Sequence, residues 1–187
     1  MEFAKYLELG IGHILDINGL DHVLFLIVLV VMYDRKSWKK VLILATAFTL
    51  GHSITLAIAG MDIIKVNNRI IEIFIAASIA VTALANIISS KGEGNGSTRY
   101  IAALLFGLVH GLGFSGFFKT ILGSDNIVLP LLGFNIGVEI AQAICVICVL
   151  IISAIITDLL KIKKRHLIIG TSLIIFFYSI YLIIERI

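Results

Sequence analysis

The chain has 187 residues, of which 59% are hydrophobic and only 14% charged, and its mean hydropathy is +1.08. Soluble domains are about half apolar and a quarter charged, so this composition excludes a soluble protein and indicates an integral membrane protein. The net charge of +3 does not indicate a nucleic-acid partner, because Lys and Arg lie in the breaks between apolar runs and form no single stripe.

Six hydrophobic segments are each long enough to cross a bilayer. A hydrocarbon core of about 30 Å needs about 20 residues of helix at a rise of about 1.5 Å per residue. The segments cover residues 7–32, 41–60, 70–89, 100–122, 128–157 and 167–184. We therefore predict one polytopic membrane domain over residues 1–187, an all-α bundle of about six transmembrane helices in the lipid bilayer.

The first segment contains ionisable residues where a membrane helix is normally apolar. Two histidines and three carboxylates or amides interrupt it, namely His13, Asp16, Asn18, Asp21 and His22. Such groups are costly in lipid and need a protein group, water or a cation as partner. The sequence Asp-Ile-Asn-Gly at positions 16–19 favours a turn over continued helix. We therefore predict that the first transmembrane helix is broken there.

Later segments carry polar side chains at comparable depth. They are His52 in the second segment, His110 in the fourth, and Asn135, Glu139 and Gln142 in the fifth. The last three are spaced i, i+4 and i+7 and so share one helix face. From the helical rise, His52, His110 and Glu139 lie roughly 12 to 18 Å below the outer surface, and Asp21 and His22 reach a similar depth. These residues are predicted to form one layer near mid-membrane.

Imidazole and carboxylate in one buried layer favour a metal site. A single buried histidine is more often a satisfied core residue, and a hydrogen-bond ladder would explain the amides of the fifth segment. Three histidines beside Asp21 and Glu139 are harder to explain by packing alone. This donor set suits nickel, cobalt, zinc or iron(II), and the absence of thiolate from the layer argues against copper(I). Glu72, near the outer end of the third segment, is either an accessory ligand or a residue that reaches to water.

The distribution of basic residues predicts the orientation. Ten of the 15 Lys and Arg residues follow the first, third and fifth segments. Because cytoplasmic loops are enriched in Lys and Arg, these breaks are predicted to be cytoplasmic. Both termini are then extracytoplasmic.

Four motifs resemble those of the HupE/UreJ family of membrane proteins, over roughly the first 150 residues. In chain order they are the run from His13 to Phe25 with its Asp-His pair, FTLGHSITL at 48–56, FGLVHGLGF at 106–114 and FNIGVE at 134–139. The resemblance implies a secondary permease, not an enzyme, that carries nickel or cobalt across a bacterial-type inner membrane into the cytoplasm.

The resemblance also implies which residues and partners matter. The site residues would be His13, Asp21, His22, His52, His110 and Glu139, and the accessory candidates from the analysis above are Glu72, Asn135 and Gln142. The divalent metal is the substrate, with zinc or iron as alternatives to nickel and cobalt. The family's association with hydrogenase and urease makes metalloenzyme maturation proteins further candidate partners.

The first motif departs from the family pattern in its spacing. The family has His-x5-Asp-His, whereas seven residues separate His13 from Asp21 here. At about 100° per residue, histidines seven apart share a helix face, but histidines nine apart point to opposite faces. We expect His13 to join Asp21 and His22 only if the backbone breaks between them, which a transporter tolerates where the break lines a cavity. Otherwise His13 lines an outer vestibule.

Two other functions stay open at this point. The first is a membrane metal-binding or sensor protein, which would bind a metal ion with the same layer of residues but would not carry it across the membrane. An intramembrane serine protease is the second, because Gly113-Phe114-Ser115-Gly116 in the fourth of six segments resembles the Gly-x-Ser-Gly of rhomboid proteases. That chemistry needs a histidine to activate the serine. In rhomboid proteases it comes from the sixth segment, and residues 167–184 contain none.

Overall fold

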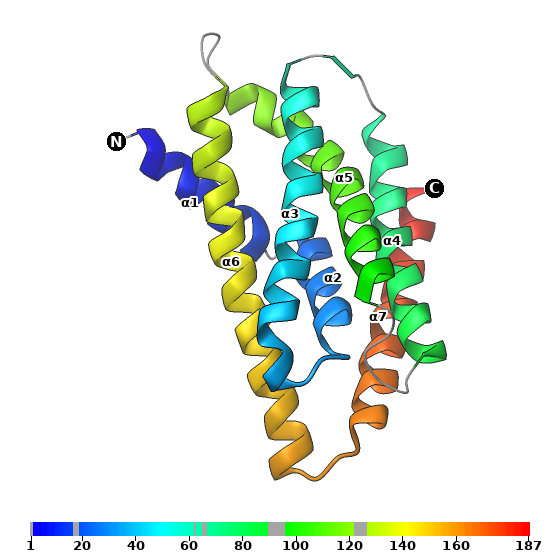
Figure 1. Ribbon diagram of the computed structural model, residues 1–187. Helices are drawn as coiled ribbons and strands as arrows, with labels where there is room; N and C mark the ends of the chain where they lie inside the picture. The colour runs from blue at the N-terminus through cyan, green and yellow to red at the C-terminus, as the bar shows by residue number, and fades with distance from the viewer. Residues whose placement is uncertain (1, 17–18, 62, 65–66, 90–95, 122–126) are drawn as a thin grey trace.

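The computed structural model describes residues 2–16, 19–61, 63–64, 67–89, 96–121 and 127–187, and within these residues its regular structure is entirely helical. Seven α-helices of the described chain form one bundle (Figure 1). They are α1 (Glu2–Leu15), α2 (Asp21–Val30), α3 (Trp38–Gly60), α4 (Asn68–Ile88), α5 (Gly96–Ile121), α6 (Val128–Ala154) and α7 (Lys164–Arg186). A 3-10 turn at Arg35–Ser37 precedes α3, and a π-helical segment at Ile155–Leu159 extends α6. The predicted all-α membrane bundle is confirmed.

The first predicted segment is broken, as expected from its polar residues. Helices α3 to α7 are long and apolar enough to cross a membrane. Helix α2 has only 10 residues, about 15 Å of helix and half the hydrocarbon thickness. It follows α1, which ends at Leu15, so the two short helices together occupy the first segment. Asn18 of the predicted turn lies outside the described residues.

Local chemistry explains several helix ends. The Asn67 side-chain oxygen accepts a hydrogen bond from the Arg69 N–H at 3.0 Å and caps α4. Pro130 lies in the first turn of α6, where its missing N–H would have no helical partner. Lys161, between the π-helical segment and α7, has a φ of 56°, so the chain turns there through the left-handed region.

Glycines allow α3 and α5 to pack backbone against backbone. A Cβ at Gly107 would collide with the Phe48 carbonyl oxygen, and a Cβ at Gly111 would collide with that of His52. Gly51 on α3 has the same relation to the Leu104 carbonyl oxygen of α5. Small residues spaced in this way are the usual means of close helix approach in membranes. The contact places His52 and His110 on facing sides of one tight helix pair.

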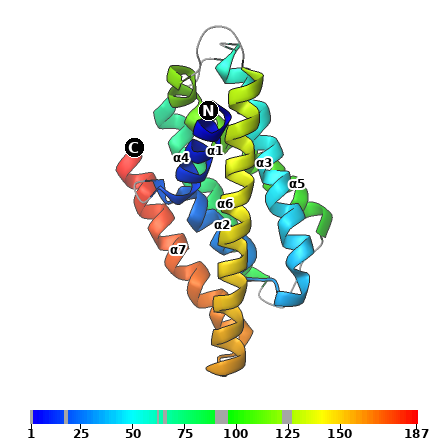
Figure 2. The same cartoon turned by 90° about the vertical axis from the view of Figure 1, so that its left-hand side faces the viewer.

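Helix α1 lies beside α6, as the turned view shows (Figure 2), and a second glycine contact joins the two helices. A Cβ at Gly10 would collide with the Phe134 carbonyl oxygen, and a Cβ at Gly137 would collide with that of Leu7. Because His13 follows Gly10 by one helical turn, this contact fixes the depth of His13 in the bundle.

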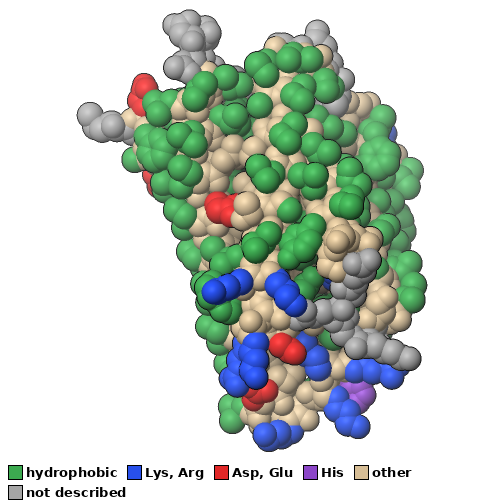
Figure 3. All heavy atoms as spheres, in the orientation of Figure 1, with side chains coloured by type: hydrophobic (Ala, Val, Ile, Leu, Met, Phe, Trp, Pro, Cys, Tyr) green, Lys and Arg blue, Asp and Glu red, His purple; other side chains and the backbone are tan. Residues whose placement is uncertain are grey.

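Basic side chains gather at one end of the molecule, and hydrophobic side chains cover most of the remaining visible surface (Figure 3). Arg35 forms an ion pair with Asp158 at 3.4 Å, and the Lys164 ammonium donates to the Tyr33 carbonyl at 2.8 Å. These contacts join the segments after the first and fifth predicted spans. The two chain ends lie towards the opposite half of the bundle (Figure 1).

We expect Gly111→Ala to destabilise the protein, because the added methyl group must displace the His52 backbone of α3. Inserting atoms into a closely packed contact costs about 1–3 kcal/mol. Gly170→Ala on α7 is the matched control, since nothing lies within 4 Å of a Cβ there. It should be neutral or stabilising by up to about 1 kcal/mol, the difference in helix propensity. Thermal unfolding in detergent measures both, and equal stability of the two variants would contradict the close packing.

Candidate metal centre

Four histidines from four different helices meet inside the bundle. They are His13 on α1, His22 in the first turn of α2, His52 on α3 and His110 on α5. The ring centroids are 4.5 Å apart for His13 and His22, 5.1 Å for His22 and His110, 5.8 Å for His22 and His52, and 5.6 Å for His13 and His52. Of the five histidines in the sequence, only His166 lies elsewhere, exposed at the start of α7.

Three of these imidazoles are close enough to share one ion. One ring nitrogen from each of His13, His22 and His52 lies within 4.8 Å of the others. Three nitrogens that bind one metal ion in a tetrahedral site, at about 2.0–2.1 Å each, are about 3.4 Å apart. Binding therefore requires the three rings to close by up to about 1.5 Å, which side-chain rotation can supply.

The ring nitrogens of the histidine cluster are buried without hydrogen-bond partners among the described residues. They are His13 Nε2, His22 Nε2, both nitrogens of His52, and His110 Nε2. The side chains of His22, His52 and His110 are at most 7% exposed. An unsatisfied buried polar atom costs about 1–3 kcal/mol, and native proteins contain few of them. Five in one cluster fit a site whose nitrogens are ligands.

The tautomer of neutral His110 follows from its one hydrogen bond. Its Nδ1 lies 2.8 Å from the Phe106 carbonyl oxygen, one turn earlier in α5. A carbonyl oxygen only accepts, so Nδ1 carries the proton and donates it. The lone pair of the neutral ring is then on Nε2, the unpartnered nitrogen. Metal-binding histidines are commonly oriented by such a second hydrogen bond.

Aromatic rings surround the cluster and limit how the imidazoles can turn. The ring centroids of Phe114 and His13 are 3.9 Å apart, and those of Phe48 and His110 are 4.9 Å apart. Phe134 of α6 stacks on His52 with an interplanar angle of 15°. An apolar shell of this kind lowers the local dielectric constant and strengthens the electrostatic interactions within it.

The two predicted carboxylate ligands make other contacts. Asp21 Oδ2 lies 3.3 Å from Arg186 Nη2, and Glu139 Oε1 accepts a hydrogen bond from Thr46 Oγ1. Thr46 precedes His52 by six residues, or about 9 Å along α3. Among the described residues, no Asp or Glu joins the three histidines within 4.8 Å. The close group in this structure therefore consists of imidazoles only.

Two of the three accessory candidates have side-chain partners of their own. Glu72 Oε2 lies 3.6 Å from Arg186 Nε, and Gln142 Oε1 accepts from Thr49 Oγ1 at 3.0 Å. Asn135 Oδ1 is buried without a hydrogen-bond partner among the described residues, next in sequence to Phe134.

Arg186 is a functional candidate that the sequence analysis missed. Besides its pairs with Asp21 and Glu72, its Nη1 donates to the Glu72 carbonyl at 2.9 Å, and its own carbonyl accepts from Arg69 Nε at 2.7 Å. The Arg186 and Asp21 side chains are only 20% and 17% exposed, so their ion pair is partly buried. One signal in the sequence could have indicated it. Arg186 lies at the end of an apolar segment, on the side of the membrane where Glu72 was also predicted to lie.

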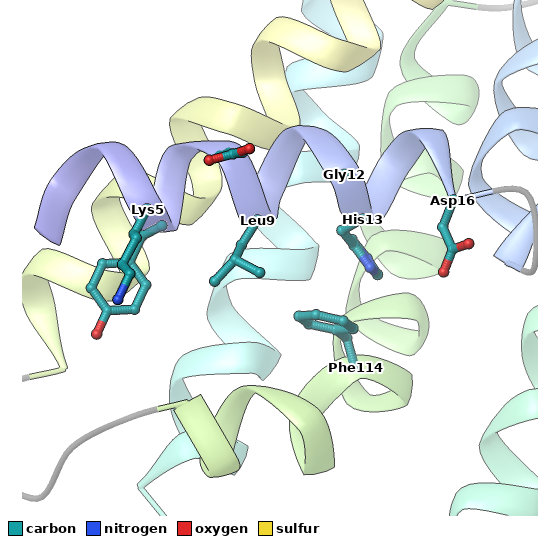
Figure 4. Close-up of a pocket in the computed structure, with 8 residues that line it drawn as sticks. Lys5, Leu9, Gly12, His13, Asp16 and Phe114 are labelled. Atoms are coloured by element: carbon teal, nitrogen blue, oxygen red, sulfur yellow. The ribbon is translucent and has the colours of Figure 1, made fainter.

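A pocket of about 820 Å³ reaches the cluster along α1. Its lining consists of Lys5, Tyr6, Glu8, Leu9, Gly12, His13, Asp16 and Phe114. Figure 4 shows the side chains of Leu9 and His13 projecting from α1 towards the side where Phe114 lies. The two sequence-based alternatives for His13 are therefore both realised, because it contacts His22 and also lines an open pocket.

The serine of the protease alternative is buried and bonded to its own helix. Ser115 Oγ donates to the Leu112 carbonyl at 2.6 Å. A nucleophilic serine instead needs a hydrogen bond to a base. The unpartnered nitrogens of His52 and His110 make no bond to it.

Comparison with known proteins gives one positive result. The sequence model of the family described as HupE / UreJ protein matches residues 1–186, nearly the whole chain. No curated protein and no solved structure matches the chain. The family match covers all four helices that carry the histidine cluster. The chain therefore belongs to the HupE/UreJ family of membrane proteins.

Proposed function

We propose that this protein is a secondary transporter that moves a divalent transition metal ion, nickel or cobalt, into the cytoplasm across a bacterial inner membrane. The observation that carries the proposal is the cluster of four imidazoles, each with at least one buried ring nitrogen that lacks a hydrogen-bond partner among the described residues. Imidazole suits nickel, cobalt, zinc and iron(II), whereas magnesium and calcium take oxygen ligands. The metal is the substrate of this site.

The membrane potential supplies a sufficient driving force. A dication gains about 4 to 5 kcal/mol on crossing an inside-negative potential of about 100 mV. That free energy corresponds to about 10³-fold accumulation at equilibrium. The sequence contains no Gly-x4-Gly-Lys-Ser/Thr loop for nucleotide phosphates. A gradient-driven permease is therefore consistent with the chain.

The ligand arrangement supports binding that is reversible. Neutral imidazoles do not cancel the charge of a dication, and Asp21 is paired with Arg186. A transport site must bind its ion firmly enough to dehydrate it and weakly enough to release it. Because the four histidines lie on four helices, small helix movements change how many of them reach the ion. Glu139 of α6 is then the next ligand on the inward path, because its partner Thr46 lies about 9 Å from His52 along α3, towards the basic end.

We predict that both termini are extracytoplasmic and that the basic end of the bundle is cytoplasmic. Reporters that function on only one side of the membrane, fused at either terminus or after residue 160, test this. The terminal fusions should give the extracytoplasmic signal and the fusion after residue 160 the cytoplasmic one. The reverse pattern would invert the transport direction proposed above.

Uptake into proteoliposomes is the direct test of function. Purified protein should accumulate nickel or cobalt under an inside-negative potential, and His52→Ala and His110→Ala should each abolish uptake. His166→Ala is the matched control, because this histidine is exposed and outside the cluster; it should transport normally, as should Ser115→Ala. Binding without uptake would support the sensor alternative. Loss of function in Ser115→Ala with active histidine variants would support the protease.

Replacing Arg186 should strengthen metal binding. Arg186→Gln removes the positive charge that pairs with Asp21, the residue before His22, and leaves the Asp21 carboxylate without its ion pair. We expect the Kd for the metal, measured by titration calorimetry, to fall about tenfold, the effect of one unit charge about 6 Å from a dication in water. Arg165→Gln, an exposed position in the first turn of the same helix, is the control. An unchanged or higher Kd in Arg186→Gln would show that Asp21 does not contribute to binding.

A further inference from the structure

The pocket along α1 has a charged lining that the histidine cluster does not explain. Lys5, Glu8 and Asp16 line it together with His13. Charged side chains are costly against lipid, so a pocket with three of them in its wall is filled with water. Its volume of about 820 Å³ exceeds the roughly 180 Å³ of six waters at about 30 Å³ each. The pocket can therefore hold a cation with a complete first hydration shell.

The charges along the pocket favour a cation at its inner end. Asp16 follows directly after α1, which ends at Leu15. The C-terminus of a helix carries about half a negative charge and leaves its last carbonyl groups without helical partners. Lys5, the one Lys or Arg among the described residues that line the pocket, is 11 residues from Asp16, about 16 Å along the helix. That distance exceeds the Debye length of about 8 Å at physiological salt, so Lys5 does not cancel the attraction.

His13 connects this pocket to the imidazoles behind it. It lines the pocket, and its Nε2 is buried without a partner among the described residues. Its ring centroid is also 4.5 Å from that of His22. Asp16 is three residues from His13, so the two side chains lie on the same face of the helix end. A cation held near Asp16 is therefore within one helical turn of the first imidazole.

We propose that the pocket along α1 is a separate binding site for the hydrated divalent cation, in which Asp16 attracts the ion and His13 replaces its first water. This inference rests on the proposed transport function and adds a step before dehydration. Asp16 acts through its charge and through bound water, so it sets the concentration at which transport is half-maximal. The histidine cluster, which the ion reaches next, sets the maximal rate.

The test compares Asp16→Asn, Asp16→Glu and Glu2→Gln in nickel or cobalt uptake by proteoliposomes at low ionic strength. Asp16→Asn should raise KM about tenfold with little change in the maximal rate, as expected for loss of one charge about 6 Å from a dication in water. Asp16→Glu should restore the low KM, and added salt should reduce the difference between variants. Glu2→Gln, on α1 but outside the pocket, should behave like wild type.

A second measurement separates access from folding. In a protein whose Cys145 and Cys148 are replaced by alanine, Gly12→Cys places a thiol in the pocket, where nothing lies within 4 Å of the new Cβ. A membrane-impermeant methanethiosulfonate reagent, which forms a mixed disulfide with the thiol and releases sulfinate, should block uptake, and a reductant that cleaves this disulfide should restore it in the same sample. If the wild type transports metal, either of two results would overturn the pocket site alone. One is an unchanged KM in Asp16→Asn, and the other is full activity after complete labelling of the thiol at position 12. Inactive wild type would instead overturn the transport function itself.

Discussion

The closest contacts in this bundle are between backbones, and the histidine cluster depends on them. Where Gly107 and Gly111 meet α3, and where Gly10 meets α6, there is no room for a single methyl group. In lipid, packing of this kind replaces the hydrophobic effect as the force that joins helices. It brings His52 and His110 together on one helix pair and sets the height of His13 on the other. The chemistry at the centre is thus positioned by residues without side chains.

Around that centre, the described carboxylates lie outside the close group of three imidazoles. Asp21 is next to His22 in sequence, yet its carboxylate is paired with Arg186, and Glu139 is bonded to Thr46. Neutral ligands bind a dication less tightly than carboxylates would, and they avoid a buried negative charge when the ion is absent. Carboxylates stand instead along the proposed route, with Asp16 before the cluster and Glu139 beyond it. Attraction, dehydration and release are then assigned to different residues.

The positions of the helices and the depths of the histidines were easier to predict from the sequence than the contacts of the carboxylate side chains. Apolar runs about 20 residues long determine where membrane helices form, and the Asp-Ile-Asn-Gly stretch correctly indicated the broken first helix. The constant rise per residue predicted the common depth of His52 and His110, which both lie near His22. It does not give the offset between neighbouring helices, so the contact of Glu139 with Thr46, about 9 Å along α3 from His52, was not predicted. Arg186 was missed for a related reason: its contacts with Asp21 and Glu72 join α7 to α2 and α4, and no local pattern encodes such contacts.

The pairing of α1 with α6 has a consequence for biogenesis. These helices pack together although Gly10 and Gly137 are far apart in the chain, with the second to fourth predicted spans between them. Ribosomes add about 5–20 residues per second, so α1 waits roughly 6–25 s for its partner. During that interval the glycine contact with α6 that sets the depth of His13 is absent. The final position of His13 is therefore completed only after the fifth predicted span has entered the membrane.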